Sequence, residues 1–406
     1  MLKILSPIFA LFLTLLIPVK SSFAVTHIDT LRTRFAATKK PTIRVRISKS
    51  MDEVLVSGTD LKRHLYPTNE EKSFSGRKSI KFNCQSFTKN NHRSVLLSKP
   101  LMLASLISPT GLVSVAGAKY NGKLHILTSP DGDSCDVVNE TGIEEYISSL
   151  LPKEMNAQWP IEALKAQAVA ARTYALFKIQ TQQVSKTNGF NTFYDLESSE
   201  KHQVSGSFFD TTKKTDLAAD ETKGEVLLGP SGHLVPTFFH AKCGGQTLRP
   251  EQVWQNKVEG YEGVKCKFCS GKGTTPWKNA VDMKRMKKFL TWARDSGQLK
   301  ISEQNLAKSV NVMKDQLFHR TVRIYLGDFP VLVSKSLLRR YFGRVVTPGG
   351  NFTLTKVKDY FLFGGEGLGH AVGMCQIGAL YMAKQGHTYK EILAHYFPEL
   401  SLNRLY

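Results

Sequence analysis

The residue whose type and position most suggest chemistry is Glu154, a carboxylate between two predicted helices. Pro160 opens the second helix, because a proline in the first turn lacks only an N–H that has no helical partner there. Apolar residues then recur at helical spacing, namely Ile161, Leu164, Ala168, Ala171, Ala175 and Ile179. The segment from Thr141 to Glu144 matches a capping box and predicts a preceding helix that runs to Pro152. Glu154 is therefore expected in a turn at the rim of a cleft.

A glutamate held between rigid elements can serve as a proton donor. Apolar Met155 and Trp159 stand close to Glu154 in the sequence, and partial desolvation would raise the pKa of its carboxyl toward the neutral range. Loops placed by rigid scaffolds also commonly carry chemistry. The alternative is that Glu154 only complements the positive end of a helix dipole. The spacing of residues alone leaves both interpretations open.

Two long motifs around this glutamate and near the C-terminus resemble the stage II sporulation protein D family. The first extends from Asn139 to Tyr174 and contains Glu154-Met155 and the Ala-rich segment, and the second extends from Gly367 to Pro398. Between them, Phe238 to Thr247 and Val253-Trp254 also fit, so the resemblance covers roughly residues 120 to 400. The sporulation member of this family is a lytic transglycosylase of peptidoglycan, and its relatives include amidase enhancers that stimulate cell-wall hydrolases.

The resemblance implies a secreted lytic transglycosylase that cleaves the bond between N-acetylmuramic acid and N-acetylglucosamine and leaves 1,6-anhydro ends. Glu154 would act first as acid and then as base, and no cofactor is required for catalysis. Arg172, Gln203, His370 and Gln376 are the residues expected to contact sugar, although polar residues at packed turns often satisfy backbone groups instead. The alternative is a non-catalytic amidase enhancer that binds glycan and activates a partner hydrolase. A purely adhesive wall-binding module is a third interpretation.

The cysteines suggest either a metal site or a disulfide. His240 and Cys243, followed by Cys266 and Cys269, have the spacing of a structural zinc site, whereas export to an oxidising compartment favours a disulfide from Cys243 to Cys266 or Cys269. A catalytic zinc is disfavoured, because four protein ligands leave no position for water. The remaining cysteines, Cys84, Cys135 and Cys375, look isolated and are expected to be buried structural residues. A Cys375–His370 nucleophile is also disfavoured, because its apolar flanks indicate an inert thiol.

The N-terminus and the charge indicate an exported protein with an anionic partner. Residues 1–24 combine a basic start, an apolar run and a small-x-small cleavage signal, and are predicted to be a secretory signal peptide. No later segment is apolar enough to cross a membrane, so periplasm or cell envelope is the expected location. The formal charge of +21, from 55 Lys and Arg against 34 Asp and Glu, favours an anionic polymer. In an exported protein the expected partner is peptidoglycan, with its carboxylates, or another envelope polymer, with its phosphates, rather than nucleic acid.

The fold class predicted from these patterns is α+β, with several lobes. Residues 25–135 alternate apolar and polar positions and form a β-rich region, and residues 136–406 form a helical catalytic core flanked by β segments. Within the latter, residues 266–310 are predicted to be a cysteine-containing, basic helical insertion. Its helix at 281–297 either docks on the core with its apolar stripe or adheres to the wall with its lysines.

Overall fold

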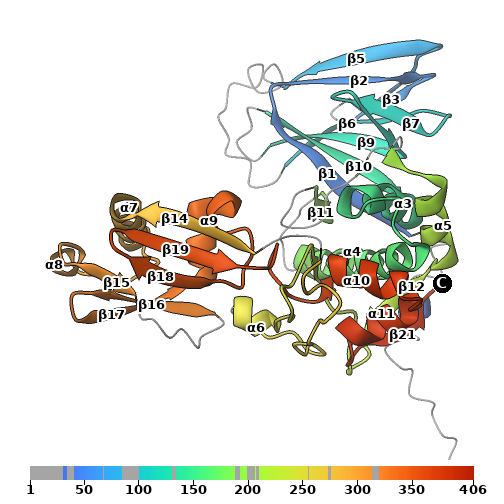
Figure 1. Ribbon diagram of the computed structural model, residues 1–406. Coiled ribbons are helices and arrows are strands. Elements are labelled where there is room, and N and C mark those ends of the chain that lie inside the picture. The colour runs from blue at the N-terminus through green and yellow to red at the C-terminus, as the bar shows by residue number, and fades with distance from the viewer. Residues whose placement is uncertain are drawn as a thin grey trace, which may run out of the picture.

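The computed structural model describes residues 31–33, 41–66, 68–84, 100–129, 134–187, 193–198, 206, 210–254, 256–272, 276–312 and 320–406. The predicted signal segment lies outside these residues. The mixed α+β fold class is confirmed, with strands in several sheets around a helical centre (Figure 1). Three hydrophobic cores divide the molecule into an N-terminal β lobe, a helical body and an inserted lobe. No helix in the described part of the chain combines the length and apolar character needed to cross a membrane.

The N-terminal lobe consists of two sheets, of seven strands in the order β11-β1-β10-β9-β6-β3-β4 and of four strands in the order β5-β2-β7-β8. The strands are β1 (Thr42–Met51), β2 (Glu53–Thr59), β3 (Lys62–Leu65), β4 (Glu70–Ser73), β5 (Arg77–Asn83), β6 (Met102–Ile107), β7 (Leu112–Val115), β8 (Ala118–Asn121), β9 (Lys123–Thr128), β10 (Cys135–Gly142) and β11 (Leu196–Glu197). The alternation expected from the sequence is present: Ile43 and Val45 face the body core, and Leu124 and Ile126 face the core of this lobe.

The helical body is built around one central helix, α4 (Ile161–Thr187). Its other elements are α3 (Ile143–Glu154), α5 (Lys213–Glu221), β12 (Glu225–Leu228), β13 (Phe239–His240), α6 (Pro250–Val253), β20 (Met374–Cys375), α10 (Gln376–Lys384), α11 (Tyr389–Tyr396) and β21 (Ser401–Arg404). The sequence predicts one apolar stripe on α4, but every residue from Ala163 to Leu176 except Lys165 is buried. Small alanine side chains allow neighbouring helices to approach α4 closely from several sides.

The inserted lobe extends from residue 277 to residue 365, well beyond the 266–310 segment expected from the sequence. It contains β14 (Trp277–Asp282), α7 (Met283–Asp295), α8 (Glu303–Leu306), β15 (Val310–Val312), β16 (Thr321–Leu326), β17 (Phe329–Ser334), α9 (Lys335–Val346), β18 (Thr353–Val357) and β19 (Tyr360–Gly365). Figure 1 shows it projecting to one side of the body. Helix α7 matches the predicted amphipathic helix and buries Met286, Phe289, Leu290 and Ala293 in the core of this lobe.

The helix before Glu154 is present, but its predicted start signal is not. Gly142 is the N-cap of α3 and makes no side-chain capping bond, so the predicted capping box is wrong. The helix also continues past Pro152 to Glu154. A proline in the last turn removes one hydrogen bond without ending the helix, because Met155 N–H still bonds to Leu151 O at 2.9 Å.

Candidate active-site cleft

Glu154 is the half-buried last residue of α3 rather than part of the turn expected from the sequence, and the turn to the second helix begins directly after it. The helix ends because Met155 takes an extended conformation, and Met155 is buried in the body core directly after the carboxylate. The connecting turn is closed by a bond from Trp159 N–H to Asn156 O at 3.0 Å. Pro160 precedes α4, and its carbonyl accepts the Ala163 N–H at 3.0 Å. The backbone on both sides of Glu154 is therefore fixed.

Glu154 faces a cleft of about 620 Å³ between the body and the inserted lobe. The cleft is lined by Lys153, Glu154, Tyr174, Thr237, Phe238, Phe239, His240, Ala241, Trp254, Arg339, Arg344, Pro348, Leu368, Gly369, His370 and Gln376. Among these described residues Glu154 is the only carboxylate. Enclosed sites with aromatic walls and few polar groups are typical ligand sites. The lining therefore presents a single carboxyl group to a cleft large enough for a ligand.

One wall of the cleft is aromatic. The rings of Phe238 and Trp254 have centroids 4.8 Å apart, and His370 lies 5.1 Å from Trp254 and 5.5 Å from His240. Tyr174 from α4 contacts the edge of this wall at 6.1 Å from Phe238, and burial raises the pKa of its phenol to about 12. Tyr174 therefore remains a neutral hydrogen-bond donor. Phe238, Trp254 and Tyr174 lie in segments that carry the family resemblance, which was the available sequence signal for them.

The two histidines of this wall are held neutral. His240 is 4% exposed and donates Nδ1–H to Val372 O at 3.0 Å, and burial lowers its pKa to about 4. Its Nε2 has no hydrogen-bond partner among the described residues. His370 accepts Val372 N–H at Nδ1, 3.1 Å away. Its enclosure, with smaller effects of His240 and Arg339, holds the pKa of His370 well below its usual range. Both rings can therefore hydrogen-bond with neutral hydroxyl or amide groups.

A short parallel pairing of β13 with β20 places His240 and Gln376 in the same cleft. Phe239 pairs with Met374 and His240 with Cys375, so Gln376 follows directly at the start of α10. Gly373 permits this pairing, because its φ of 72° and its contact with Phe238 O leave no room for a side chain. The Gln376 amide lies 3.4 Å from Gln167 Oε1. His370 and Gln376 thus line the cleft with Glu154.

Arg172 does not lie in the cleft, and this corrects its expected sugar contact. Its side chain is fully buried on α4 and forms an ion pair with Glu144 at 2.6 Å. It also donates to the carbonyl groups of Ala219 and Glu225. Arg172 therefore joins α4 to α3, α5 and β12 and serves the fold. The fourth expected sugar ligand, Gln203, lies outside the described residues.

Two cationic residues of the cleft come from the inserted lobe and were not expected from the sequence. Arg339 and Arg344 lie on α9, and both line the same cleft as Glu154. Arg339 is fixed by donating Nε–H and Nη2–H to the carbonyls of Thr347 and Pro348, each at 3.1 Å. The only sequence signal was a run of apolar and basic residues from Leu337 to Arg344. This run predicts a helix, but it does not predict that its arginines line the cleft.

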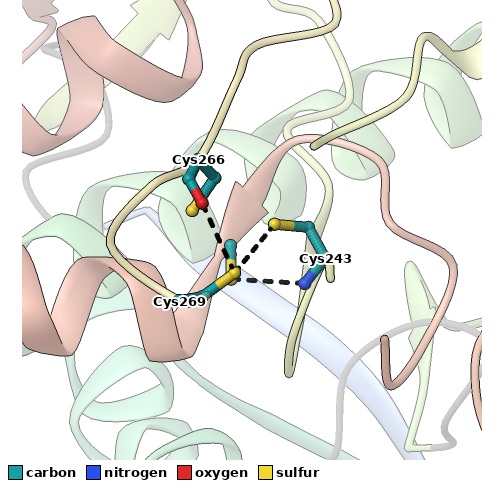
Figure 2. Close-up of side chains that lie close together, drawn as sticks. Cys243, Cys266 and Cys269 are labelled. Carbon is teal, nitrogen blue, oxygen red and sulfur yellow. Dashed lines mark hydrogen bonds between the residues drawn. The ribbon is translucent and has the colours of Figure 1, made fainter. Parts of the chain in front are cut away.

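Four buried cysteines meet behind the cleft wall, and Figure 2 shows three of them converging. The Sγ atoms of Cys243, Cys266, Cys269 and Cys375 all lie within 4.8 Å of one another. Tetrahedral coordination by Zn–S bonds of about 2.3 Å requires sulfur atoms about 3.8 Å apart. The Cys375 sulfur also accepts N–H bonds from Cys243 at 3.4 Å and Gly378 at 3.3 Å, as metal thiolates commonly do. This donor set fits one zinc ion.

The cysteine assignments made from the sequence need two corrections. His240 points its ring to the cleft wall and is replaced in the thiol cluster by Cys375, which the sequence left isolated. Cys84 and Cys135 are not isolated either, because they form a disulfide in the N-terminal lobe. Residues far apart in the sequence meet here through sheet pairing, which spacing alone does not reveal. The disulfide is compatible with an exported protein.

Comparisons with known proteins agree with this architecture. The family model described as SpoIID, stage II sporulation protein, matches residues 131–228, which include all of α3 and α4. An uncharacterised protein of Brachyspira hyodysenteriae is 35% identical over 286 residues, covering 69% of this chain and 71% of that protein. The chain therefore belongs to the stage II sporulation protein D family. This membership supports a cell-wall related role.

Two further relatives carry functional names. The amidase enhancer of Bacillus subtilis is 26% identical over 335 residues, which cover 73% of this chain but 45% of that protein. The chain thus spans less than half of the length of that relative. Stage II sporulation protein D of Bacillus amyloliquefaciens is 26% identical over 278 residues, covering 66% of this chain and 75% of that protein.

Proposed function

We propose that this protein is an exported peptidoglycan lytic transglycosylase that cleaves the bond between N-acetylmuramic acid and N-acetylglucosamine. The observation that carries the proposal is the single carboxylate, Glu154, among the described lining residues of the cleft. Glycosidases that use water usually need two carboxylates, one as acid and one as nucleophile or base. An intramolecular attack by a sugar hydroxyl needs only one, because the acid of the first step becomes the base of the second.

In the proposed reaction, the Glu154 carboxyl protonates the glycosidic oxygen as its bond to C1 of the muramic acid breaks. The C6 hydroxyl of the same sugar then closes on C1, and the Glu154 carboxylate takes its proton. The glutamate returns to its protonated form, and no water is consumed. General acid–base catalysis is most effective when the group can both donate and accept a proton at the working pH.

The remaining lining residues have roles that fit a sugar chain. Phe238 and Trp254 offer apolar faces for the sugar rings. Gln376 and Tyr174 can bond with acetamido groups. These assignments give Phe238, Trp254, Tyr174 and Gln376 contacts with a bound sugar chain.

A second candidate function is that of an amidase enhancer. One relative carries that name, and a protein that binds glycan without cutting it could use the same cleft to present strands to a partner amidase. The enhancer function needs no proton donor, whereas the cleft presents Glu154 on a fixed backbone. For this reason the transglycosylase is the preferred function.

We also propose that Cys243, Cys266, Cys269 and Cys375 hold one structural zinc ion. Four thiolates leave no open position for water, so the ion would stabilise the fold and take no part in catalysis. Cys243 lies three residues after His240, and Cys375 directly precedes Gln376. The ion would therefore fix both strands that bring these residues into the cleft.

The test of the main proposal is a digest of purified glycan strands by the exported full-length protein, with products measured by mass spectrometry. A transglycosylase gives fragments that end in 1,6-anhydro sugars, with no mass added by water. Products with one added water would identify a hydrolase. Intact strands, together with faster digestion when a cell-wall amidase is added to peptide-bearing glycan, would establish the enhancer function.

A further inference from the structure

A second cavity continues the cleft along the inserted lobe. It has a volume of about 600 Å³, lies between Trp254 of the body and α9 of the lobe, and shares Phe238, Trp254, His370, Arg339 and Arg344 with the cleft that contains Glu154. We call this cavity the α9 groove. A strand bound with one end near Glu154 can therefore extend into the α9 groove without leaving the protein surface.

The charged residues of the α9 groove all have the same sign. Those among its described lining are Arg320, Lys335, Arg339, Arg340 and Arg344. Clefts lined by one sign of charge raise the local concentration of oppositely charged ligands. Guanidinium groups also match the planar geometry of carboxylates. The ligand expected in the groove is therefore an anion with carboxylate or similar groups.

The groove is built from fixed side chains rather than from a random set of surface lysines. Arg339 is oriented by two backbone carbonyls, and Arg340 donates to Gln298 Oε1 at 2.8 Å while lying over the ring of Trp292. Lys335 is only 6% exposed, and its ammonium lies 5.5 Å from the ring of Phe352. Its ammonium forms no hydrogen bond or ion pair with another described residue. A buried charge without an anionic partner in the protein is ready to receive one from a ligand.

We propose that the α9 groove is a subsite for the carboxylates carried by muramic acid residues along the glycan. This inference rests on the proposed function, because it places in the groove the next muramic acid of the strand, which one N-acetylglucosamine separates from the muramic acid that reacts at Glu154. Muramic acid carries a lactyl group, which is a free carboxylate in peptide-free strands and is linked to a stem peptide with its own carboxylates in peptide-bearing strands. The inserted lobe would then select an acidic glycan over neutral polymers of N-acetylglucosamine.

The experiment measures binding in the full-length protein with Glu154→Gln, so that strands are not cut. The groove variant adds Arg320→Gln and Arg340→Gln, which line the groove but not the Glu154 cleft. The matched control adds Lys284→Gln and Lys287→Gln on α7, which removes the same charge from the same lobe. Ligands are peptide-free strands, peptide-bearing strands and a neutral oligomer of N-acetylglucosamine.

The groove variant should bind acidic strands about tenfold more weakly, since two exposed charge contacts are lost. Its binding of the neutral oligomer and the binding of all ligands by the control should change less than twofold. A loss confined to peptide-free strands identifies the lactyl carboxylate, and a loss confined to peptide-bearing strands identifies the stem peptide. The proposal is overturned if the control loses as much affinity as the groove variant, or if the neutral oligomer is affected equally.

A charge-preserving variant separates folding from binding. Arg320→Lys with Arg340→Lys should keep most of the affinity, and its melting temperature should match that of the groove variant. If the lysine variant loses tenfold in affinity for the neutral oligomer as well as for acidic strands, general repacking of the lobe explains the result and the subsite is disproved. Because binding is read without turnover, a failure to find anhydro products would leave this measurement unaffected.

Discussion

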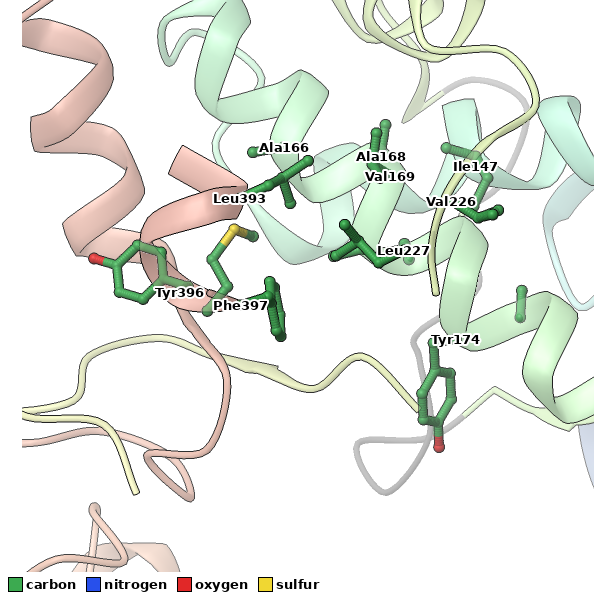
Figure 3. Close-up of a cluster of buried hydrophobic side chains, with 14 of the residues drawn as sticks. Ile147, Ala166, Ala168, Val169, Tyr174, Val226, Leu227, Leu393, Tyr396 and Phe397 are labelled. Atoms are coloured by element: carbon green, nitrogen blue, oxygen red, sulfur yellow. The ribbon is translucent and has the colours of Figure 1, made fainter. Parts of the chain in front are cut away.

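The helical body and the inserted lobe contribute to the same cleft in different ways. The body supplies Glu154 and the aromatic wall on elements packed around α4, and Figure 3 shows Ala166, Ala168 and Val169 of this helix among Leu393 and other buried side chains. The lobe has a separate core and supplies only Arg339, Arg344 and Pro348 to the cleft. The two regions thus differ in what they bring to the cleft, because the body supplies the single carboxylate of the described lining and the lobe supplies two arginines.

The strongest test of this division is Glu154→Gln. The amide keeps the size and hydrogen bonding of the side chain but has no proton to transfer, so glycan cleavage should fall by about a hundred- to ten-thousand-fold. Affinity for strands should stay within about twofold, because the lobe and the aromatic wall are unchanged. Release of anhydro products over time, with binding measured in parallel, checks both parts. Wild-type cleavage by the variant would show that another group is the acid.

Cys269→Ser should abolish the metal content of the protein and destabilise the body. Loss of a structural metal belongs to the small set of changes that cost about 4 kcal/mol or more. Metal analysis by mass spectrometry and thermal unfolding give the two measurements, with zinc restored to one portion of each sample. The control is Cys84→Ala with Cys135→Ala, which removes the disulfide of the N-terminal lobe and should leave the metal bound. A metal-free wild-type protein in which these thiols form disulfides would contradict the zinc proposal.

Phe289→Ala tests whether the lobe is an independent unit. Phe289 is fully buried in the lobe core, and its truncation should cost about 3–5 kcal/mol. Hydrogen exchange should accelerate for amides of the lobe and remain unchanged for α3 and α4. Val345→Ala is the matched control, because Val345 is 87% exposed on the same lobe. Equal acceleration in body and lobe would show that the two regions unfold together and that the comparison fails.

The sequence predicted the parts of this structure that depend on local patterns. Helices α3, α4 and α7 were expected from their apolar spacing, and Glu154 was placed correctly at the cleft because it lies between two of them. The cysteine cluster was only partly expected: Cys375 is separated from Cys243 by 132 residues and meets it through the pairing of β13 with β20. Arg172 was misassigned because a charged residue in a motif is equally suited to a buried ion pair.

The smallest expected effect concerns pH. Burial lowers the pKa of Lys335 to about 8, so its ammonium is charged below pH 8 and neutral above it. The other charged groups that face the α9 groove are arginines, which stay charged, and His370 is already neutral. Affinity for acidic strands should therefore decrease by about two- to fivefold as pH rises from 7 to 9. Lys335→Met should bind more weakly and show no such slope, and an identical slope in this variant would assign the titration to another group.

The pairing of β14 with β19 has a consequence for how the chain reaches its folded state. Trp277 stands opposite Gly365 in this register, so the two ends of the inserted lobe are adjacent when its own strands have paired. Without that pairing, the parts of the body before residue 277 and after residue 365 would be joined by a disordered stretch of roughly 90 residues. Closing that loop has an entropic cost of about 3 kcal/mol relative to a short turn. If the lobe folds first, its paired ends join these two parts of the body by a short connection instead. A lobe of this size therefore need not slow the assembly of the body core around it.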